Sequence, residues 1–375
     1  MSFRYAAGIN KPGFSPLTPT LAYNLFSWGN NDLGQLGLNA AGNKSSPNQV
    51  GSLTDWSSIE GGVYTTAAIK TDGTIWTWGL NDYGQLGLGN TTTYSSPKQV
   101  GSLVNWYKFS CGARFIVSIK TDGTLWSWGN NSSGQLGFGN TTGYSSPKQV
   151  GALTTWLQVS GGYAYTAAIK TDGTLWTWGN NYYGNLGLNN TTNYSSPKQV
   201  GALTTWSKVC CNSYATFAIK TDGTLWSWGL NNYGQLGLGN VTYYSSPKQV
   251  GALTNWSTLG HGVQADFVVS VKTDGTFWSW GRNNYGQLGL GTSGTYTAKS
   301  SPTQVGALTT WSKVSLNNTS TATIKTDGTL WSWGYNGYGA LGLGNTTYYS
   351  SPKQVGLSTT WLYIGCGGVS SFAVG

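Results

Sequence analysis

The sequence predicts an all-β protein folded as a seven-bladed β-propeller with four-stranded blades. The tripeptide Ser/Thr-Trp-Gly occurs seven times, at spacings of 50 to 53 residues. The chain has 56 glycines and only 8% charged residues, which suits turns and aromatic strands better than helices. All 20 tryptophans occupy three positions of the repeat. A sheet with two apolar faces must stack on copies of itself, and radial stacking of such sheets forms a propeller.

One repeat illustrates the strands that we expect. Residues 203–209 and 215–220 are rich in β-branched and aromatic residues, as strands are. Asp222-Gly223 predicts a tight hairpin turn, after which residues 224–229 form the third strand. A short fourth strand is expected around residues 234–237, Gly-Gln-Leu-Gly. Each repeat is therefore expected to form one antiparallel sheet.

The third strand predicts how the blades pack. Successive side chains of a strand point to opposite faces, so Trp226 and Trp228 share one face and Leu225 lies on the other. Large aromatic side chains dominate buried cores. We therefore expect the tryptophans to pack between blades.

The two ends of the chain predict how the ring closes. There are seven Trp-Gly strands but six Asp-Gly turns, so one blade lacks its internal hairpin. Residues 357–375 are expected to supply the first two strands of that blade, and residues 23–37 the last two. The predicted organisation is a single propeller over residues 22–375 and an extended arm over residues 1–21.

The charge is spread by the repeat. There are 20 basic and 11 acidic residues, a net charge of +9. Most lysines recur in the segments Ile-Lys-Thr-Asp-Gly and Ser-Ser-Pro-Lys-Gln-Val, so they form rings and no patch, which argues against nucleic acid as a partner. No window offers the roughly 20 apolar residues of a membrane helix, and residues 1–20 lack the apolar core of a secretory signal. We expect no membrane insertion and no signal peptide.

The cysteines and the single histidine argue against a metal site or a cofactor. Cys111, Cys211 and Cys366 share one repeat position in blades that are not neighbours, too far apart for a disulfide, and Cys210 is adjacent to Cys211. Free, buried thiols are expected. His261 is the only histidine, so a cluster of metal ligands is not expected.

Acidic residues outside the hairpin turns are few. Catalysis by acid, base or nucleophile needs positioned groups beside one another. The acidic residues outside the hairpin turns are too scattered along the sequence to nominate a catalytic set, and no enzyme activity is predicted. They are Asp32, Asp55, Glu60, Asp82 and Asp266.

The motifs Asp-Gly, Trp-Ser-Trp-Gly-x-Asn and Gly-Gln-Leu-Gly, in register over residues 22–375, resemble the regulator of chromosome condensation (RCC) repeats. The resemblance implies the propeller fold. Its members include guanine-nucleotide exchange factors, a plant photoreceptor and an inhibitor of β-lactamase, so it implies no single activity. A histidine usual in the family is replaced here, for instance by Thr65, Phe115 and Tyr165, and Glu60 is the only glutamate. Both departures argue against nucleotide exchange.

Tyrosines recur in two variable segments. One set follows the Trp-Gly strand, with Arg282 nearby, and is the predicted binding surface for a protein or a glycan. It comprises Tyr83, Tyr183, Tyr233, Tyr285 and Tyr338. The other set comprises Tyr94, Tyr194, Tyr244 and Tyr349. An alternative remains open at this point, in which each tyrosine covers the edge of its own blade.

The first eight residues are similar to the openings of some structural proteins of tailed phages. Phe3, Arg4 and Tyr5 are therefore predicted to dock the arm to other virion proteins. The leading hypothesis is a non-enzymatic virion component that contacts a partner or a host surface through the propeller loops. The alternative is a cellular interaction scaffold or inhibitor in the cytoplasm, and a less favoured one is a guanine-nucleotide exchange factor.

Overall fold

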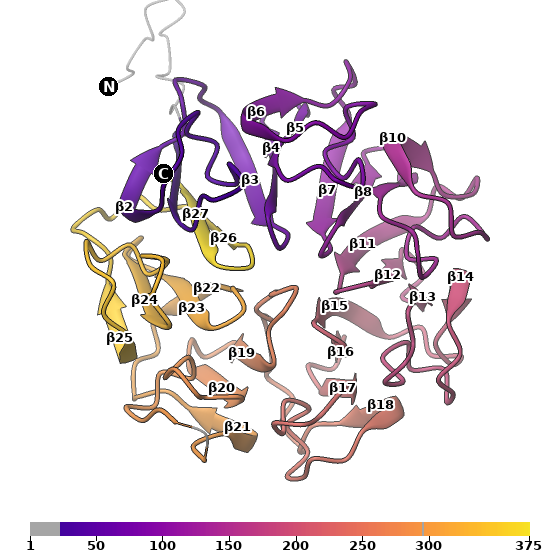
Figure 1. Cartoon of the computed structure of the whole chain (residues 1–375). Helices are drawn as coiled ribbons and strands as arrows, with labels where there is room; N and C mark the ends of the chain where they lie inside the picture. Colours follow the sequence, from indigo (N-terminus) through magenta and orange to yellow (C-terminus); the bar gives the residue numbers. More distant parts are fainter. Residues whose placement is uncertain (1–22, 295) are drawn as a thin grey trace, which may run out of the picture.

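Seven β-sheets surround a central axis in the computed structural model, which describes residues 23–294 and 296–375 (Figure 1). The predicted arm, with Phe3, Arg4 and Tyr5, lies outside these residues. Within them, no helix is long and apolar enough to cross a membrane. The predicted seven-bladed propeller is confirmed, and each predicted sheet is antiparallel.

Five blades are built from four consecutive strands each, the innermost strand first. Blade 1 contains β3 (Trp56–Gly61), β4 (Thr65–Lys70), β5 (Ile75–Gly79) and β6 (Tyr94–Gln99). Blade 2 contains β7 (Trp106–Cys111), β8 (Phe115–Lys120), β9 (Leu125–Gly129) and β10 (Tyr144–Gln149). Blade 3 contains β11 (Trp156–Gly161), β12 (Tyr165–Lys170), β13 (Leu175–Gly179) and β14 (Tyr194–Gln199). Blade 4 contains β15 (Trp206–Asn212), β16 (Ala215–Lys220), β17 (Leu225–Gly229) and β18 (Tyr244–Gln249). Blade 6 contains β22 (Trp311–Leu316), β23 (Ser320–Lys325), β24 (Leu330–Gly334) and β25 (Tyr349–Gln354).

The position of the fourth strand corrects one prediction. The Gly-Gln-Leu-Gly segment at 234–237 forms turns, and the fourth strand is the Tyr-Ser-Ser-Pro-Lys-Gln segment at 244–249. A proline is tolerated there because this strand is the outer edge of the sheet. Gly234 and Gly237 adopt positive φ values of 73° and 74°, which suit a turn and not a strand.

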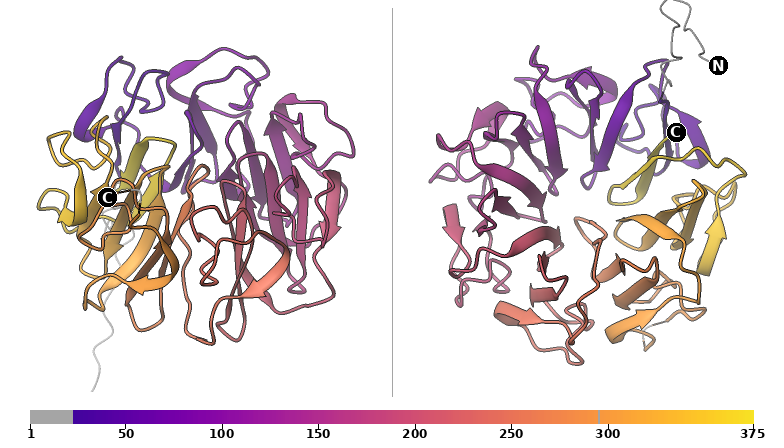
Figure 2. Two further views of the ribbon diagram at one scale, coloured as in Figure 1. Left: turned by 60° about the horizontal axis from the view of Figure 1, so that its bottom comes forward. Right: turned by 180° about the vertical axis from the view of Figure 1, so that it is seen from behind.

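Blade 7 joins the two ends of the chain, as predicted. It contains β26 (Tyr363–Cys366), β27 (Ser370–Val374), β1 (Leu25–Gly29) and β2 (Lys44–Gln49). Leu25 pairs with Val374 and Gly29 with Ser370, so the seam is an ordinary antiparallel ladder. Figure 2 shows, from behind, the yellow C-terminal strand beside the indigo N-terminal one. The outer strand lies at 44–49, beyond the predicted range of 23–37, for the same reason as in blade 4.

Blade 5 differs from the others at the axis. Its strands are β19 (Phe267–Val271), β20 (Phe277–Gly281) and β21 (Lys299–Gln304), and a single bridge from Trp256 to Lys272 marks its innermost position. Lys272 lies sixteen positions after Trp256, whereas Lys220 lies fourteen positions after Trp206 in blade 4. In the segment from Ser257 to Gln264, the backbone N–H groups of Ser257, Thr258 and Gly260 still donate to β19, but no regular strand forms. The segment turns toward the centre of the ring (Figure 1).

Tryptophans hold neighbouring blades together, as predicted. Trp228 is fully buried and packs with Trp206 against Ile169 and Leu175 of blade 3. Leu225, on the opposite face of the same strand, packs toward blade 5. Each blade therefore presents indoles to one neighbour and aliphatic side chains to the other.

The Gly-Gln-Leu-Gly turns make the polar part of the same junction. Trp228 Nε1 donates a hydrogen bond to the backbone oxygen of Asn185 in the preceding blade, at 3.0 Å. The equivalent bond recurs at all seven junctions of the described ring, at 2.8 to 3.0 Å. These turns, which were predicted as strands, thus provide backbone oxygens that accept hydrogen bonds from the tryptophans of the next blade.

We expect a glycine of this turn to be required for stability. In Gly187→Ala the new Cβ atom would lie 2.6 Å from Trp228 Nε1, on a backbone with φ +72°. The free energy of unfolding should fall by about 1–3 kcal/mol, measured by chemical denaturation. Gly201→Ala is the matched control, because its φ is also positive (+60°) but nothing lies within 4 Å of the new Cβ. Equal losses in the two variants would contradict the role of the junction.

Candidate functional site

The predicted binding tyrosines lie on one end of the ring. Antiparallel strands place the loop between strands one and two at the same end as the loop between strands three and four. We call this end the tyrosine face, and define it by the side chains that these loops gather. They are Tyr83, Arg114, Tyr163, Tyr182, Tyr183, Tyr214, Tyr233, Tyr243, Arg282, Tyr285, Tyr335, Tyr338 and Tyr348.

One aromatic cluster spans blades 3 and 4. The ring of Tyr183 lies 5.1 Å from that of Tyr214 and 5.8 Å from that of Tyr243. Tyr163 contacts Tyr214 at 5.3 Å. Burial, with the neighbouring Tyr163 and Tyr183, raises the pKa of Tyr214 to about 12. The Tyr214 phenol therefore stays neutral at physiological pH, and the cluster offers flat apolar rings with hydroxyl tips.

A second cluster spans blades 5 and 6. Tyr335 lies at its centre, 5.0 Å from Tyr285, 4.7 Å from Tyr348 and 6.0 Å from Tyr338. Burial and the hydrogen bond with Tyr348 raise the pKa of Tyr335 to about 12. The structure thus gathers the predicted tyrosines into clusters rather than spacing them evenly around a ring.

Two arginines each lie over the ring of a tyrosine from the preceding blade. Arg114 pairs with Asp82 at 2.8 Å and lies over the ring of Tyr83, 5.0 Å from its centroid. Arg282, predicted to accompany the tyrosines, lies 5.2 Å from the centroid of Tyr233.

Arg282 also faces a buried acid. Its Nη1 lies 3.7 Å from Asp266 Oδ2. Burial raises the pKa of Asp266, although Arg282 and Ser213 act in the opposite direction. Both guanidinium groups are thus held in place by a carboxylate and an aromatic ring.

A cleft opens on this face beside Arg114. Its volume is about 380 Å³, and its lining is contributed by three blades and by Gln264 of the blade 5 segment. Tyr83, Arg114 and Tyr163 line it together with Asn130 and Gln135. An aromatic and guanidinium lining with polar side chains around it can accept a side chain of a partner.

The second tyrosine set has a different place. Tyr94, Tyr194, Tyr244 and Tyr349 begin the outer strands β6, β14, β18 and β25. Tyr194 and Tyr244 are half-buried against the core between blades 3 and 4. Lys198 lies 5.4 Å from the centroid of Tyr194, within the same strand. The tyrosines of this second set therefore cover the edges of their own blades, which is the alternative left open by the sequence.

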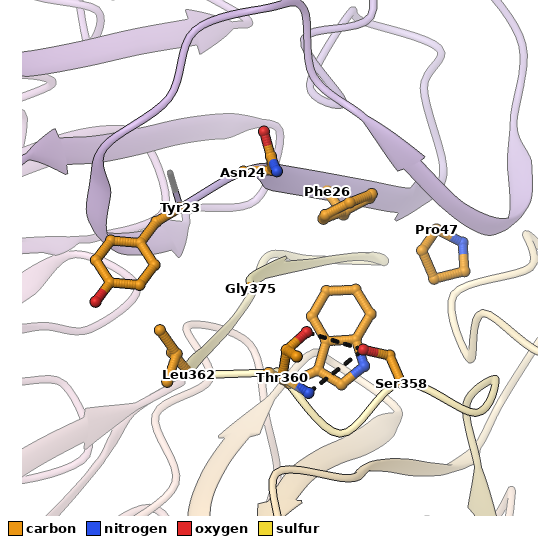
Figure 3. Close-up of a pocket in the computed structure, with 9 residues that line it drawn as sticks. Tyr23, Asn24, Phe26, Pro47, Ser358, Thr360, Leu362 and Gly375 are labelled. Carbon is orange, nitrogen blue, oxygen red and sulfur yellow. Dashed lines mark hydrogen bonds between the residues drawn. The ribbon is translucent and has the colours of Figure 1, made fainter. Parts of the chain in front are cut away.

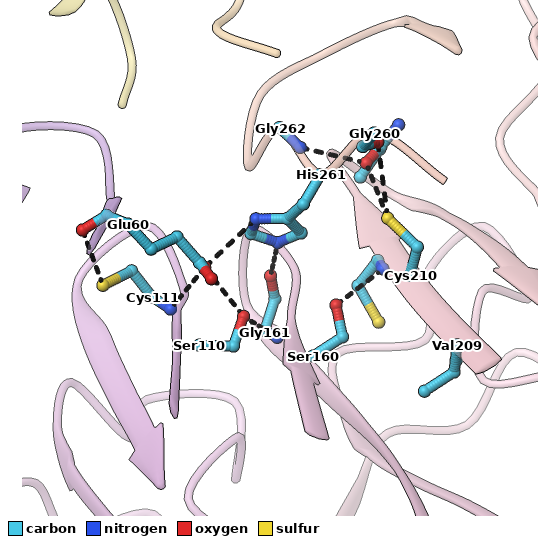
Figure 4. A network of polar contacts seen from close by, with 12 residues as sticks. Glu60, Ser110, Cys111, Ser160, Gly161, Val209, Cys210, Gly260, His261 and Gly262 are labelled. Carbon is cyan, nitrogen blue, oxygen red and sulfur yellow. Dashed lines mark hydrogen bonds and ion pairs between the residues drawn. The ribbon is translucent and has the colours of Figure 1, made fainter. Parts of the chain in front are cut away.

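An ion pair lies near the axis of the ring (Figure 4). His261 Nδ1 of the blade 5 segment is 3.1 Å from Glu60 Oε1 of blade 1, and the two side chains are 17% and 21% exposed. His261 Nε2 lies 2.8 Å from the backbone oxygen of Gly161 in blade 3. Both ring nitrogens face acceptors, and the protonated imidazole, which donates from both nitrogens, matches this geometry. These residues are 201 positions apart in sequence, so the structure brings together two groups that are scattered along the chain.

The Glu60 carboxylate also accepts hydrogen bonds from blade 2. Glu60 Oε1 accepts hydrogen bonds from Ser110 Oγ at 2.9 Å and from the Cys111 backbone N–H at 2.8 Å. Burial lowers the pKa of His261, but the charge of Glu60 and the hydrogen bonds to Glu60 and Gly161 outweigh it and raise the pKa overall. The pair therefore ties blades 1, 2, 3 and 5 together.

The same geometry provides no activated nucleophile. Ser110 Oγ donates to Glu60 and accepts from the Gly161 N–H at 3.1 Å, and His261 has no free nitrogen to act as a base for it. Burial raises the pKa of Cys211 to about 12 and that of Cys366 to about 11. All four cysteines are buried and free, as predicted. No group of three or more His, Cys, Asp or Glu side chains between Tyr23 and Gly375, Thr295 apart, is arranged to hold a metal ion.

Sequence reasoning missed the axial pair and most partners of the tyrosines. Glu60 falls where other innermost strands carry Ser110 or Ser160, and His261 where they carry Gly161 or Cys211. Comparing copies at these positions would have placed both residues at the innermost position of their blades. Tyr214 and Arg114 were missed because they lie in the loops between strands one and two, outside the segments compared.

The sequence profile of the RCC1-like domain matches residues 24–373, almost the whole described ring. The chain belongs to the RCC1-like domain family. The RCC resemblance expected from the repeat motifs is therefore confirmed.

Several solved structures have the same fold. Prp20p from Saccharomyces cerevisiae superposes with a TM-score of 0.83 and 21% sequence identity, over 95% of this chain and 92% of that chain. Human WBSCR16 gives a TM-score of 0.83 and 21% identity, over 94% and 98% of the two chains. At such identity the likeness concerns the fold.

The yeast protein is described with its own partners. The Prp20p structure is reported with binding to Gsp1p and histones, and a second structure shows Kap60 bound to yeast RCC1 (Prp20). The second superposes over 100% of this chain with 20% identity. In the RCC1-like chain described here, the tyrosine face and the axial pair are the features that stand out from the repeat.

Proposed function

We propose that this RCC1-like propeller is a non-enzymatic protein-interaction module that binds a protein partner through the tyrosine face. The observation that carries the proposal is the gathering of tyrosines and both described arginines on one end of the ring, which also has a cleft of about 380 Å³ beside Arg114. Tyrosine and arginine are enriched among the residues that dominate binding energy in protein interfaces.

The exposure of these side chains supports the same proposal. Tyr83 is 45% exposed and Tyr182 is 73% exposed, so rings remain available to a partner. Arg114 is fixed by Asp82 and Tyr83 before any partner arrives, which lowers the entropy lost on binding. A preorganised aromatic and guanidinium surface suits a folded protein surface.

The exposed leucines at the opposite end of the ring are less suited to anchor a partner than the tyrosines are. It exposes leucines of the blade-linking loops, such as Leu153, Leu203 and Leu253, each from a different blade. Singly exposed apolar side chains are normal on soluble proteins. These leucines therefore provide the control surface for the experiment.

The virion hypothesis is not carried forward. Its motif lies in residues 1–8, outside the described residues, and the family match gives it no support. The proposal follows the alternative of an interaction scaffold or inhibitor. Nucleotide exchange on a small GTPase is expected to be absent, since no feature of the tyrosine face favours it.

We expect the double variant Tyr83→Ala/Arg114→Ala to lose its partner. Recovery of the partner from an extract of the source organism, quantified by mass spectrometry, should fall by about tenfold or more, because each truncation of an anchor residue commonly costs 1–2 kcal/mol or more. The matched control Leu203→Ala/Leu253→Ala should recover it at the wild-type level. Loss in the leucine variant with retention in the tyrosine face variant would overturn the proposal.

A further inference from the structure

Blade 7 differs from its neighbours where β27 meets β1. In blade 6, Lys325 lies over two indoles, 3.7 Å from the ring centroid of Trp331 and 4.8 Å from that of Trp311. Lysines occupy the same place in blades 1 to 5 of the described ring. An ammonium over the face of an aromatic ring is attracted by the negative potential of that face. This lysine and its two rings therefore form a unit of the repeat.

The aromatic pair of this unit is retained in blade 7. Phe26 and Trp361 take the places of Trp331 and Trp311, with ring centroids 5.3 Å apart and an interplanar angle of 81°. The blade 6 pair has nearly the same geometry, at 6.0 Å and 82°. The rings of blade 7 are thus arranged to receive an ammonium.

The lysine of this unit is replaced by glycine. Val374 pairs with Leu25 as Ile324 pairs with Leu330, so the residue after Val374 takes the place of Lys325. That residue is Gly375, and its backbone N–H donates to the Asn24 oxygen as the Lys325 N–H donates to the Thr329 oxygen. Gly375 has no side chain to lay over the rings.

A large apolar pocket results. It has a volume of about 710 Å³ and is lined by Phe26, Trp361, Pro47 and Ser358 among others. Figure 3 shows Tyr23 and Phe26 on one side of it and Ser358, Thr360 and Leu362 on the other.

Three residues around this pocket are smaller than their counterparts in other blades. Gly375 stands in place of a lysine, Phe26 in place of a tryptophan, and Ser358 in place of the leucine found at 253 and 308. The hydroxyls of Ser358 and Thr360, 2.9 Å apart, lie at the wall as hydrogen-bond acceptors. Walls of aromatic rings with hydroxyl acceptors suit an alkyl chain that ends in an ammonium group.

We propose that the pocket between Phe26, Trp361 and Gly375 binds the side chain of a lysine presented by a partner polypeptide. The described ring itself supplies the precedent, because six of its blades place a lysine on the same pair of rings. The site lies at the end of the ring that carries the Asp-Gly hairpins, opposite the tyrosine face, so it goes beyond the proposed function and does not depend on it.

The test uses a small lysine probe on the full chain. Nα-acetyl-lysine N-methylamide is titrated by calorimetry, and saturation-transfer NMR identifies the protons in contact. One binding site is expected, with contact along the side-chain methylenes. The neutral Nε-acetylated probe should bind at least about fivefold more weakly, because it lacks the charge that the rings attract. Equal affinity for the two probes would overturn the assignment.

Two variants locate the site. Gly375→Lys restores the residue found in the other blades and should abolish probe binding. Lys325→Gly empties the equivalent place in blade 6 and should add a second site, raising the stoichiometry from one to two. Undiminished probe binding in Gly375→Lys would contradict a partner lysine at this pocket. Probe binding that appears only after residues 1–20 are removed would also contradict it, because a segment of the chain itself would then occupy the pocket.

Discussion

Replacing Trp228 with alanine is expected to lower the free energy of unfolding by about 3–5 kcal/mol, the usual cost of deleting a buried aromatic side chain. The indole is fully buried between blades 3 and 4, and its Nε1 donates to the Asn185 backbone oxygen at 3.0 Å. The substitution removes the packing and the hydrogen bond together and leaves a cavity at the junction. Chemical denaturation followed by circular dichroism measures the loss.

Two companion variants separate packing from hydrogen bonding. Trp228→Phe keeps most of the apolar contact, and the Asn185 oxygen still accepts from Thr216 Oγ1 at 2.7 Å, so we expect a loss of about 1–2 kcal/mol. Tyr182→Ala, on an exposed side chain, should change stability by no more than about 0.5 kcal/mol. A Trp228→Ala variant as stable as Tyr182→Ala would show that the indoles do not hold the blades together.

The axial ion pair is expected to make stability depend on pH in a defined direction. The pKa of His261 is raised in the folded protein, while in the unfolded chain it has its ordinary value of 6.5. The folded state therefore holds the proton more tightly, so protonation stabilises the fold. This contribution is complete below about pH 6.5 and is lost as the pH rises through the raised folded value.

The comparison of wild type with His261→Gln isolates this effect. The stability difference between them should be about 1–3 kcal/mol at pH 6, because the variant leaves Glu60 without its cation, and should shrink as the pH rises to 9. The groups that face the imidazole are Glu60 on β3, Ser110 and Cys111 on β7, the Gly161 carbonyl on β11, and Lys208 and Cys210 on β15.

Two further variants test whether the effect belongs to the pair. Glu60→Gln should remove most of the same pH dependence, since the charge that raises the histidine pKa is gone. Lys208→Met should leave it largely in place, because the Lys208 ammonium hydrogen-bonds to the Ser257 backbone oxygen rather than to the pair. A stability difference that grows between pH 6 and 9 would have the wrong sign for a protonated His261.

The strand order of each blade was largely predictable because the same pattern of strand and turn residues occurs seven times in the sequence. The fourth strand was misplaced because Gly-Gln-Leu-Gly repeats as faithfully as a strand does, and its glycines serve turns with positive φ. Tyr-Ser-Ser-Pro-Lys-Gln escaped notice because a proline normally argues against a strand, and only its place on the outer edge permits it there.

The candidate sites were predictable only in part. The tyrosines after the Trp-Gly strands were identified from variation among copies, and they do lie on one face. Their partners Arg114 and Tyr214 come from the next blade, and periodicity within one repeat carries no information about that contact. The blade 7 pocket was missed because its three small residues come from both ends of the chain.

The sequence by itself determined the propeller, the number of its blades, the seam between the chain ends and the burial of the indoles, because all of these follow from local strand and turn chemistry repeated in register. Tertiary structure alone decided that Glu60 and His261 meet near the axis and that Phe26, Trp361 and Gly375 leave a pocket. Those contacts join residues hundreds of positions apart, and closing the ring, not any local preference, brings them within reach.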